Sequence, residues 1–537
     1  MGMFLNSKAP HEAYKKAMKS PFFVDKSLLL TELIPSFDSL NCYCCITRPR
    51  RFGKTVMANM IGAFFGRTDK EDKIFEQLAI SGQKEYKIHL NSHDVIYIDF
   101  SRAPKGCKSY AQYIERIENG LIEDLMQAYD DCKIEKENSV WDALQRIYEQ
   151  TDSRFLFVLD EWDALFHMPF ISVEDQKEYL FFLKLMLKDQ PYVEFAYMTG
   201  VLPITKYSSG SELNMFVEYD MAMSEKFSEY FGFSDSEVDH LYRIYLKNVA
   251  TPKFSREELR IWYDGYYTAT GVRLYNPRSV VLALTDNQLR NYWTSSGPYD
   301  EVFYYIQHNI DDVRDDLALM VSGEQVFADI GQFTAVSMEI NSREQIYSAM
   351  VVYGLLTYKE GEVLIPNKEL MDKFNELLMS KNSLGYIYNL ARKSDQMLQA
   401  TIAGDTKVME EILQFAHDTE SPVLAYNNEA ELSAVVNLCY LSARNKYRIE
   451  REERAGKGFV DFIFYPELKN EDGIILELKV NSTPEDAIAQ IKEKNYMLRF
   501  KGMLGEKTKY TGRLLAVGIS YNKKTKKHSC KVEVLET

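Results

Sequence analysis

The sequence predicts a multidomain α/β protein that begins with a mostly parallel β-sheet covered by helices on both faces. The chain has 537 residues, of which 46% are apolar and 13% aromatic, enough for several buried cores. Continuous apolar runs of strand length alternate with amphipathic, helix-like runs in the first part of the chain. A second group of strand-like runs lies near the C-terminus, after a less regular helical region. These observations favour an α/β domain with a mostly parallel sheet, a helical middle region and a smaller C-terminal α/β domain.

The first part of the chain contains four expected strands joined by expected helices. A helix within residues 11–34 leads into the first strand. The expected strands are apolar at nearly every position, and they cover residues 42–47, 95–100, 155–161 and 193–199. The expected helices repeat apolar residues at three- and four-residue intervals, and they cover residues 54–65, 109–129 and 179–188. This alternation predicts parallel strands connected by crossover helices.

The segment ITRPRRFGKT follows the first expected strand and opens the next helix. Its residues Gly53, Lys54 and Thr55 match the end of the phosphate-loop pattern G-x-x-x-x-G-K-[ST]. In such a loop, N–H groups at a helix N-terminus and the lysine bind phosphate oxygens, while the threonine hydroxyl binds Mg²⁺. Arg48 replaces the first glycine, which makes the loop stiffer and more basic. We expect Arg48 and Arg51 to bind the nucleotide as well.

The third expected strand ends in two acidic residues, Asp160 and Glu161. A carboxylate at the C-terminal end of a parallel strand can hold hydrated Mg²⁺, and the next acid can orient the attacking water. We therefore predict a Mg-ATP site in which Thr55 and Asp160 hold the metal and Glu161 is catalytic. Thr199, at the end of the next strand, is either a sensor of the γ-phosphate or an ordinary strand-terminal threonine. The sequence identifies no arginine finger.

Two further strands are predicted by the runs GKGFVDFIFYP and IILELKV, which a polar turn separates. Asp461 lies in the first strand, and Glu477 and Lys479 share one face of the second because strand side chains alternate. If the strands pair as a hairpin, Asp461 approaches that face. Asp461 and Glu477 could then hold Mg²⁺ or Mn²⁺ while Lys479 positions the water that attacks a phosphodiester. For Glu477 and Lys479 alone, the alternative is an ordinary ion pair.

A helix should follow these strands, since Thr483 and Pro484 form a suitable N-cap and first turn. We expect this helix to carry Gln490 and Tyr496, which strengthens the combined pattern.

Several segments carry a resemblance to a known family: FVDK, TRPRRFGKT, VLDEWDALF, MTGVLPITKY, FGFSDSEV, WYDGY and LYNPRSVV. Together they resemble the bacterial AAA-ATPase-like family that is commonly fused to a C-terminal PD-(D/E)xK nuclease-like domain. The resemblance runs nearly end to end, and the family shares the replaced first glycine. It implies a helical lid after the last ATPase strand, a nuclease domain in which Glu429 matches an acidic residue of the first helix, and a role in defence against phage or mobile DNA.

The resulting domain prediction has four parts: an AAA-like P-loop ATPase domain at residues 1–230, a helical lid at 231–290, a helical or winged-helix-like connector at 291–420, and a PD-(D/E)xK domain at 421–537. The last boundary is placed at Ser421-Pro422. The connector either binds DNA or only links its neighbours. We interpret WYDGY as a packed corner rather than a site.

Charge and cysteine usage narrow the range of partners. The net charge of −15 argues against non-specific nucleic-acid binding by the whole chain. Residues 440–537, however, carry 20 basic and 14 acidic side chains, which favours DNA as a local partner. The alternative is a solvated lysine-rich surface, with the lysines of residues 523–527 protecting an edge hairpin. We interpret the seven cysteines as reduced core residues.

The predicted function is an ATP-dependent or ATP-regulated nuclease with ATP and Mg²⁺ as cofactors. The alternative is a nucleotide switch that binds nucleic acid or a protein partner without cutting. A translocase that does not cut is disfavoured, because only one phosphate loop is present. A homo-oligomer and a protein or phage-derived trigger are both compatible with the sequence. With no apolar run long enough for a membrane helix and no signal-peptide layout, we expect a cytoplasmic protein without membrane contact.

Overall fold

The computed structural model describes residues 2–68, 73–204, 212–293, 310–321, 323–330, 342–380, 386–418, 429–455, 458–466, 468, 470–500 and 512–535. The chain forms two compact units: residues 1–298 with 328–369, and residues 299–327 with 370–537. The segment expected to be one connector, residues 291–420, is therefore shared between the units. The expected boundary at Ser421-Pro422 lies outside the described residues.

A five-stranded parallel sheet organises the first unit, in the order β2-β3-β4-β1-β5. Its strands are β1 Tyr43–Thr47, β2 Asp94–Asp99, β3 Phe155–Asp160, β4 Val193–Gly200 and β5 Val217–Tyr219. The four predicted strands are confirmed. The edge strand β5 was not predicted, because three residues carry too little periodicity to recognise. All carboxyl ends of the strands lie at one edge, where the phosphate loop follows β1.

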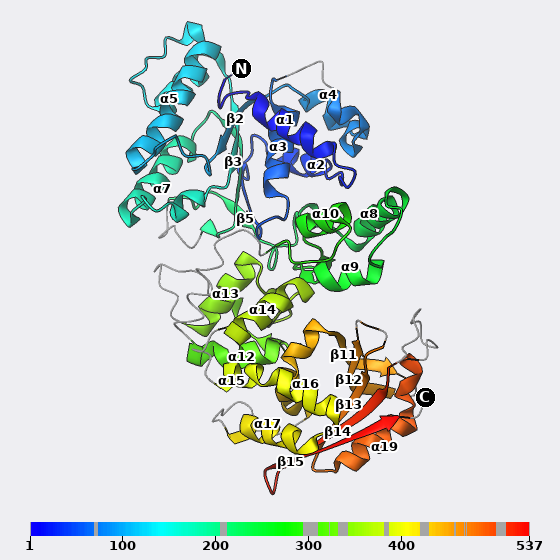
Figure 1. The fold of residues 1–537 in the computed structure, drawn as a ribbon. Coiled ribbons are helices and arrows are strands. Elements are labelled where there is room, and N and C mark those ends of the chain that lie inside the picture. The colour runs from blue at the N-terminus through cyan, green and yellow to red at the C-terminus, as the bar shows by residue number, and fades with distance from the viewer. Residues whose placement is uncertain are drawn as a thin grey trace. The chain divides into compact units, whose positions relative to one another are not determined.

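Helices cover both faces of this sheet, as predicted. In Figure 1, α5 and α7 lie on one side of the strands and α1 and α3 on the other. Successive residues of β3 alternate between the two cores: Phe157 packs with α5, α6 and α7, and Val158 packs with α1 and α3. The helices are α1 Lys8–Met18, α2 Leu29–Leu33, α3 Lys54–Phe65, α4 Lys84–His89, α5 Tyr110–Ala128, α6 Val140–Thr151 and α7 Val173–Leu187.

Helix α7 begins earlier than its periodicity predicts. The Ser172 side chain accepts from the Asp175 N–H while the Asp175 carboxylate accepts from the Ser172 N–H, a capping box that starts the helix at Val173 rather than near Tyr179.

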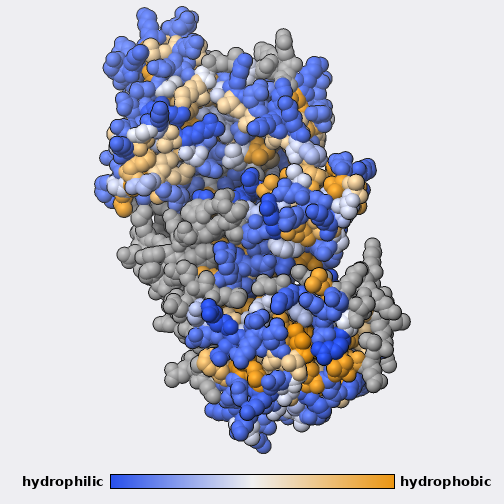
Figure 2. Space-filling view, in the orientation of Figure 1, coloured by the Kyte–Doolittle hydropathy of each residue, from blue (hydrophilic) through white to orange (hydrophobic). Residues whose placement is uncertain are grey.

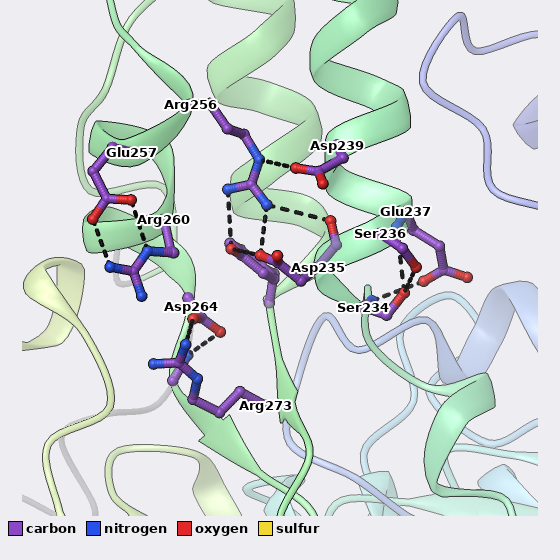
Figure 3. Close-up of polar contacts among 12 residues, drawn as sticks. Ser234, Asp235, Ser236, Glu237, Asp239, Arg256, Glu257, Arg260, Asp264 and Arg273 are labelled. Atoms are coloured by element: carbon purple, nitrogen blue, oxygen red, sulfur yellow. Dashed lines mark hydrogen bonds and ion pairs between the residues drawn. The ribbon is translucent and has the colours of Figure 1, made fainter.

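Three helices follow the sheet and pack around a small core of their own: α8 Asp235–Asn248, α9 Arg256–Tyr263 and α10 Pro277–Asp286. Between α9 and α10, β6 Tyr266–Tyr267 and β7 Arg273–Leu274 form a two-stranded antiparallel ribbon. The Arg256 guanidinium donates to Asp235 at 2.6 Å and to Asp239 at 2.8 Å, and so ties the start of α9 to α8 (Figure 3). Arg273 forms an ion pair with Asp264 at 3.3 Å in the same cluster. The region expected to be a lid is thus helical and internally cross-linked.

The WYDGY segment forms a packed corner, in agreement with the structural interpretation. Gly265 has φ +119°, and a Cβ there would lie 1.9 Å from the backbone oxygen of Pro366. The next residue, Tyr266, is fully buried and its ring packs edge-on against Phe52 of the phosphate loop, with centroids 4.9 Å apart. The corner therefore supports the phosphate loop from outside.

A helix and a hairpin complete the first unit: α13 Arg343–Tyr353, β9 Thr357–Lys359 and β10 Glu362–Leu364. The hairpin agrees with the expectation for LLTYKEGEVLIPN.

The second unit contains a five-stranded sheet in the order β11-β12-β13-β14-β15, in which only the β13–β14 pair is parallel. Its strands are β11 Tyr447–Ala455, β12 Gly458–Pro466, β13 Gly473–Val480, β14 Leu514–Asn522 and β15 Lys527–Leu535. The two strands predicted from GKGFVDFIFYP and IILELKV are β12 and β13, and they pair as a hairpin. β11 was not predicted, because its sequence YRIEREERA is highly charged.

Helices also line this second sheet. α19 Pro484–Lys494 packs through Ile488 and Ile491 on the face that contains Ile475. On the opposite face, the ring of Tyr440, which follows α18, lies 5.2 Å from that of Phe464. The other described helices of the middle and C-terminal regions are α12 Ile310–Val321, α14 Lys368–Ser380, α15 Tyr386–Arg392, α16 Ser394–Ala403, α17 Thr406–Asp418 and α18 Glu429–Cys439; α14 begins in the first unit.

On the face shown in Figure 2, hydrophilic residues predominate and hydrophobic ones form separate groups. Among the described residues, no helix is both long and apolar enough to cross a membrane.

We predict that Gly265→Ala will destabilise the first unit by roughly 2–5 kcal/mol, because the new methyl group would overlap a backbone oxygen and the residue would keep a left-handed conformation. Gly271→Ala is the matched control, since its φ is also positive at +78° but the added Cβ would meet nothing within 4 Å. We expect a loss of about 1 kcal/mol there. Urea unfolding monitored by circular dichroism measures both, and equal losses would contradict the role assigned to this corner.

Candidate active sites

A cavity of about 730 Å³ lies within the first unit, between the phosphate loop, the segment after α1 and the helices that follow the sheet. Its lining includes the polar residues Lys54, Thr55 and Glu161. It also includes aromatic and aliphatic residues: Phe22, Phe23, Val24, Tyr230, Phe233, Val281 and Leu282. A lining that combines polar groups with aromatic and aliphatic side chains suits a ligand with a phosphate end and a flat ring.

The predicted phosphate loop contributes residues 50–55 to the cavity lining. Gly53 has φ +92° and caps α3, whose first N–H groups face the loop. The Lys54 ammonium is buried and donates to the backbone oxygens of Arg48, at 2.8 Å, and Pro49, at 3.1 Å. Burial lowers the pKa of Lys54 to about 8, although Asp163, Glu161 and Asp160 oppose the change.

Asp160 lies at the end of β3 and is almost fully buried. Its Oδ1 accepts from the Thr199 hydroxyl at 2.6 Å, whereas Oδ2 is buried without a hydrogen-bond partner among the described residues. Burial raises the pKa of Asp160, and nearby Thr55 and Lys54 oppose the rise. Thr199 does not line the cavity, so in this conformation it orients Asp160.

Glu161 is half-buried and reaches the cavity from a left-handed backbone conformation, with φ +52°. Burial raises its pKa, and the neighbouring charge of Asp160 adds to the effect. The sequence interpretation missed Asp163, whose Oδ2 accepts from the N–H groups of Val201, at 2.9 Å, and Leu202, at 2.8 Å. Asp163 thereby fixes the end of β4 beside the cavity.

Arg48 does not line the cavity, contrary to the expectation that it binds the nucleotide. Its guanidinium is buried behind the loop, donates to the backbone oxygens of Thr47, at 2.8 Å, and Tyr219, at 2.6 Å, and stacks on the Phe231 ring. Burial lowers its pKa to about 10. The physical reason is that the side chain points away from the cavity and bridges β1 and β5.

The expected Arg51 does line the cavity and also donates to the backbone oxygen of Tyr292. Two further cations, Arg50 and Arg278, line it as well. Arg278 is placed at the start of α10 by Asn276, whose side chain caps the helix. The segment LYNPRSVV indicates a helix N-terminus at Arg278. The sequence does not indicate that this residue lines the cavity, because Arg278 is more than 200 residues away from the phosphate loop in the chain.

The second candidate site lies on the β12–β13 hairpin. The register that pairs Phe462 with Leu476 places Asp461 opposite Glu477. Asp461 Oδ2 accepts from the Leu478 N–H at 2.7 Å, which holds the carboxylate at this position. The Lys479 ammonium lies 3.6 Å from Glu477 Oε1. The three predicted residues are therefore brought together.

Glu477 is the most buried of them, with an exposed fraction of 3%. The Gln490 amide on α19 donates to its Oε1, whereas Oε2 is buried without a partner among the described residues. Burial, followed by the charge of Asp461, raises the pKa of Glu477 to about 8, and Lys479 opposes the rise. Tyr496 follows α19, in the short 3₁₀ helix Tyr496–Arg499, rather than lying within it. Its pKa is raised by burial and by Glu477, whereas Gln490 opposes the rise.

Glu429 begins α18, but its side chain lies outside the described structure. Among the described residues, no group of three or more histidines, cysteines or acids is arranged to hold a metal. The lysines of residues 523–527 lie at the exposed turn of the β14–β15 edge hairpin. This position is compatible with both alternatives, a DNA contact and a solvated edge.

Both sites fit a hard divalent cation. Mg²⁺ and Mn²⁺ prefer oxygen ligands, and a buried carboxylate oxygen without a partner is costly unless a proton or a cation satisfies it. Asp160 Oδ2 and Glu477 Oε2 are such atoms. Thr55 with Asp160, and Asp461 with Glu477, are the residues that would hold the ions.

Comparison with known proteins identifies two domains. Residues 13–209 match the AAA-ATPase-like family, described as predicted AAA-ATPase, and residues 427–528 match the PD-(D/E)XK nuclease superfamily. The chain therefore contains an AAA-ATPase-like domain and a C-terminal domain of the nuclease superfamily. This finding confirms the resemblance seen in the motifs.

The chain is also similar to individual proteins. A protein from the 5′ region of vnfD in Azotobacter chroococcum mcd 1 is 23% identical over 508 residues, which cover 89% of this chain and 90% of that protein. A Walker-type ATPase of Pyrococcus abyssi is 13% identical, with a TM-score of 0.34, over 65% of this chain and 94% of that one. The ORC2 protein of Aeropyrum pernix is 11% identical, with a TM-score of 0.32, over 71% and 97%.

We predict that Glu477→Gln will stabilise the metal-free protein at high pH. The folded-state pKa of about 8 exceeds an unfolded value of about 4.3, so the contribution of Glu477 to the free energy of unfolding is fully present below pH 4.3 and is lost as pH rises through 8. Glutamine cannot ionise. In EDTA, the melting temperature of the variant should therefore exceed that of wild type at pH 9 and match it at pH 4.5.

Glu485→Gln, an exposed position on the same helix as Gln490, is the control and should change neither melting temperature. A variant that is no more stable than wild type at pH 9 would show that Glu477 is not held in an environment that favours its neutral form.

Proposed function

We propose that the protein is an ATP-dependent or ATP-regulated nuclease, in which the N-terminal domain binds and hydrolyses Mg-ATP and the C-terminal domain cleaves DNA. The observation that carries the proposal is the assembly of Asp461, Glu477 and Lys479 in a chain that also has a phosphate-loop cavity. The match to the nuclease superfamily supports DNA as the substrate class.

In the N-terminal domain, the loop and α3 would bind the phosphates of ATP. An ammonium group has three N–H donors, and the loop's own carbonyls take two of those of Lys54, so the third is the one to reach a phosphate oxygen. Arg50, Arg51 and Arg278 add positive charge around the cavity. The aromatic and aliphatic residues of the lining would hold the base, and Glu161 would orient water toward the terminal phosphate.

In this site, Mg²⁺ would neutralise charge on the phosphate oxygens when it is bound. Thr55 and Asp160 are its proposed ligands. The Thr199 hydroxyl keeps the Asp160 carboxylate in one orientation, and whether it also senses the γ-phosphate is part of the proposal.

In the C-terminal domain, Asp461 and Glu477 would hold the metal whose charge stabilises a pentacovalent phosphate during cleavage. The Leu478 N–H and the Gln490 amide orient these two carboxylates. Lys479 lies half-exposed beside them and would hold the attacking water or offset negative charge. Glu429 is proposed as an additional acid on the strength of the family resemblance.

The family resemblance supports a role in defence against phage or other mobile DNA. We also propose that the protein can form a homo-oligomer and respond to a protein or phage-derived trigger. The second candidate function is a nucleotide switch that binds DNA or protein without cutting, and the following measurements separate it from a nuclease.

We predict that Asp461→Ala will reduce DNA cleavage by more than about 100-fold, because it removes a proposed metal ligand and leaves Glu477 as the only carboxylate of the pair. Plasmid, linear and single-stranded DNA, and RNA, are incubated with protein, Mg²⁺ or Mn²⁺, and with or without ATP. Asp472→Ala is the control because this acid, in the turn before β13, pairs with Arg513 outside the site. Equal products from wild type and Asp461→Ala would refute the nuclease, and DNA binding without products would favour the switch.

We predict that Lys54→Ala will lower ATP turnover by at least roughly 100-fold, because positioning and charge stabilisation supply most of the catalysis of phosphoryl transfer. Lys84→Ala, which removes an exposed lysine of α4, should leave turnover unchanged. Phosphate release measures turnover, and calorimetric titration with a non-hydrolysable ATP analogue measures binding. If ATP turnover is unchanged in Lys54→Ala, the phosphate loop is not the site of ATP hydrolysis.

A further inference from the structure

The carboxylate of Glu369, on helix α14, accepts hydrogen bonds from α10 and from a segment that contacts the phosphate loop. It is fully buried, and its Oε1 accepts from the N–H groups of Tyr292, at 2.7 Å, and Trp293, at 2.8 Å. Its Oε2 accepts from the Ser279 hydroxyl at 2.9 Å. Three donors from two segments distant in sequence therefore converge on one side chain in the first turn of α14.

The segment that Glu369 holds is in direct contact with the phosphate loop. The Arg51 guanidinium donates to the backbone oxygen of Tyr292, and the Trp293 indole donates to the backbone oxygen of Arg50 at 3.4 Å. Trp293 is fully buried, so this contact is fixed by packing. Both Arg50 and Arg51 line the nucleotide cavity.

Ser279 provides the second route to the cavity. It lies on α10, immediately after the cavity-lining Arg278. A movement of either the loop or α10 on nucleotide binding must therefore alter the hydrogen bonds received by Glu369. Burial raises the pKa of this carboxyl to about 7. The hydrogen bonds from Trp293, Tyr292 and Ser279 oppose the rise, because they stabilise the ionised carboxylate.

Helix α14 starts at Lys368 in the first unit, and from Leu370 onward its residues belong to the second unit, which contains Asp461 and Glu477. We propose that Glu369 is a positioning residue that couples nucleotide binding at the phosphate loop to helix α14, and so to the unit that carries the nuclease site. This inference rests on the proposed function of the cavity and adds the route by which ATP would regulate cleavage.

The test is hydrogen exchange of the intact protein with and without a non-hydrolysable ATP analogue. In wild type, amides of α3 report nucleotide binding, and those of the first turns of α14 should exchange about tenfold more slowly, which is within the usual range of coupling between sites. Glu369→Ala should keep the protection of α3 and lose that of α14. Glu369→Gln, which retains one acceptor oxygen, should restore part of it.

Two further variants separate coupling from stability. Asp124→Asn changes another buried carboxylate that accepts three backbone N–H groups, those of Met3, Phe4 and Leu5, and should leave the α14 response intact. Trp293→Phe removes the indole N–H but keeps an aromatic ring, and should weaken the response. It provides the test if Glu369→Ala does not fold.

The outcomes are distinguishable. If wild type shows no protection of α3 and no heat of binding, the proposed ATP site fails and the coupling fails with it. If α3 is protected while α14 is unchanged, or if folded Glu369→Ala and Trp293→Phe both keep the full α14 response, the ATP site stands and the coupling is refuted.

Discussion

The conformation of the phosphate loop is imposed by contacts from outside the loop, and the nucleotide cavity depends on them. A glycine-rich loop reaches its shape through its own backbone freedom, but this one contains three arginines and a proline before Phe52. Arg48 is anchored to β5, Pro49 packs against Gly354, and Phe52 contacts Tyr266. The loop is thus contacted by residues that follow it by about 170 to 300 positions in the sequence.

The helices that follow the sheet and the helix–hairpin region therefore take part in shaping the loop and its cavity. Arg256 cross-links α8 and α9, and Arg278 at the start of α10 lines the cavity. Several segments that are distant in sequence therefore contact the loop or line its cavity.

Four buried carboxylates differ in how their oxygens are satisfied. Asp124 and Glu369 have both oxygens occupied by N–H or O–H donors. Asp160 and Glu477 each keep one buried oxygen without a partner among the described residues. An acid in that condition favours protonation or a cation. One criterion, a buried carboxylate oxygen without a partner among the described residues, therefore distinguishes candidate metal ligands from the other two acids.

The sequence by itself determined the features that local patterns encode. Apolar runs placed the central strands and the strands β12 and β13, and strand parity placed Glu477 and Lys479 on one face. The pairing that brings Asp461 to that face was conditional in the sequence and is given by the β12–β13 register. Tertiary structure decided the rest: the inward turn of Arg48, the short strand β5, the charged strand β11, and the contacts of Arg278 and Glu369 with the loop region. These depend on pairings between residues far apart in the chain, and no local period records which distant partner a side chain will meet.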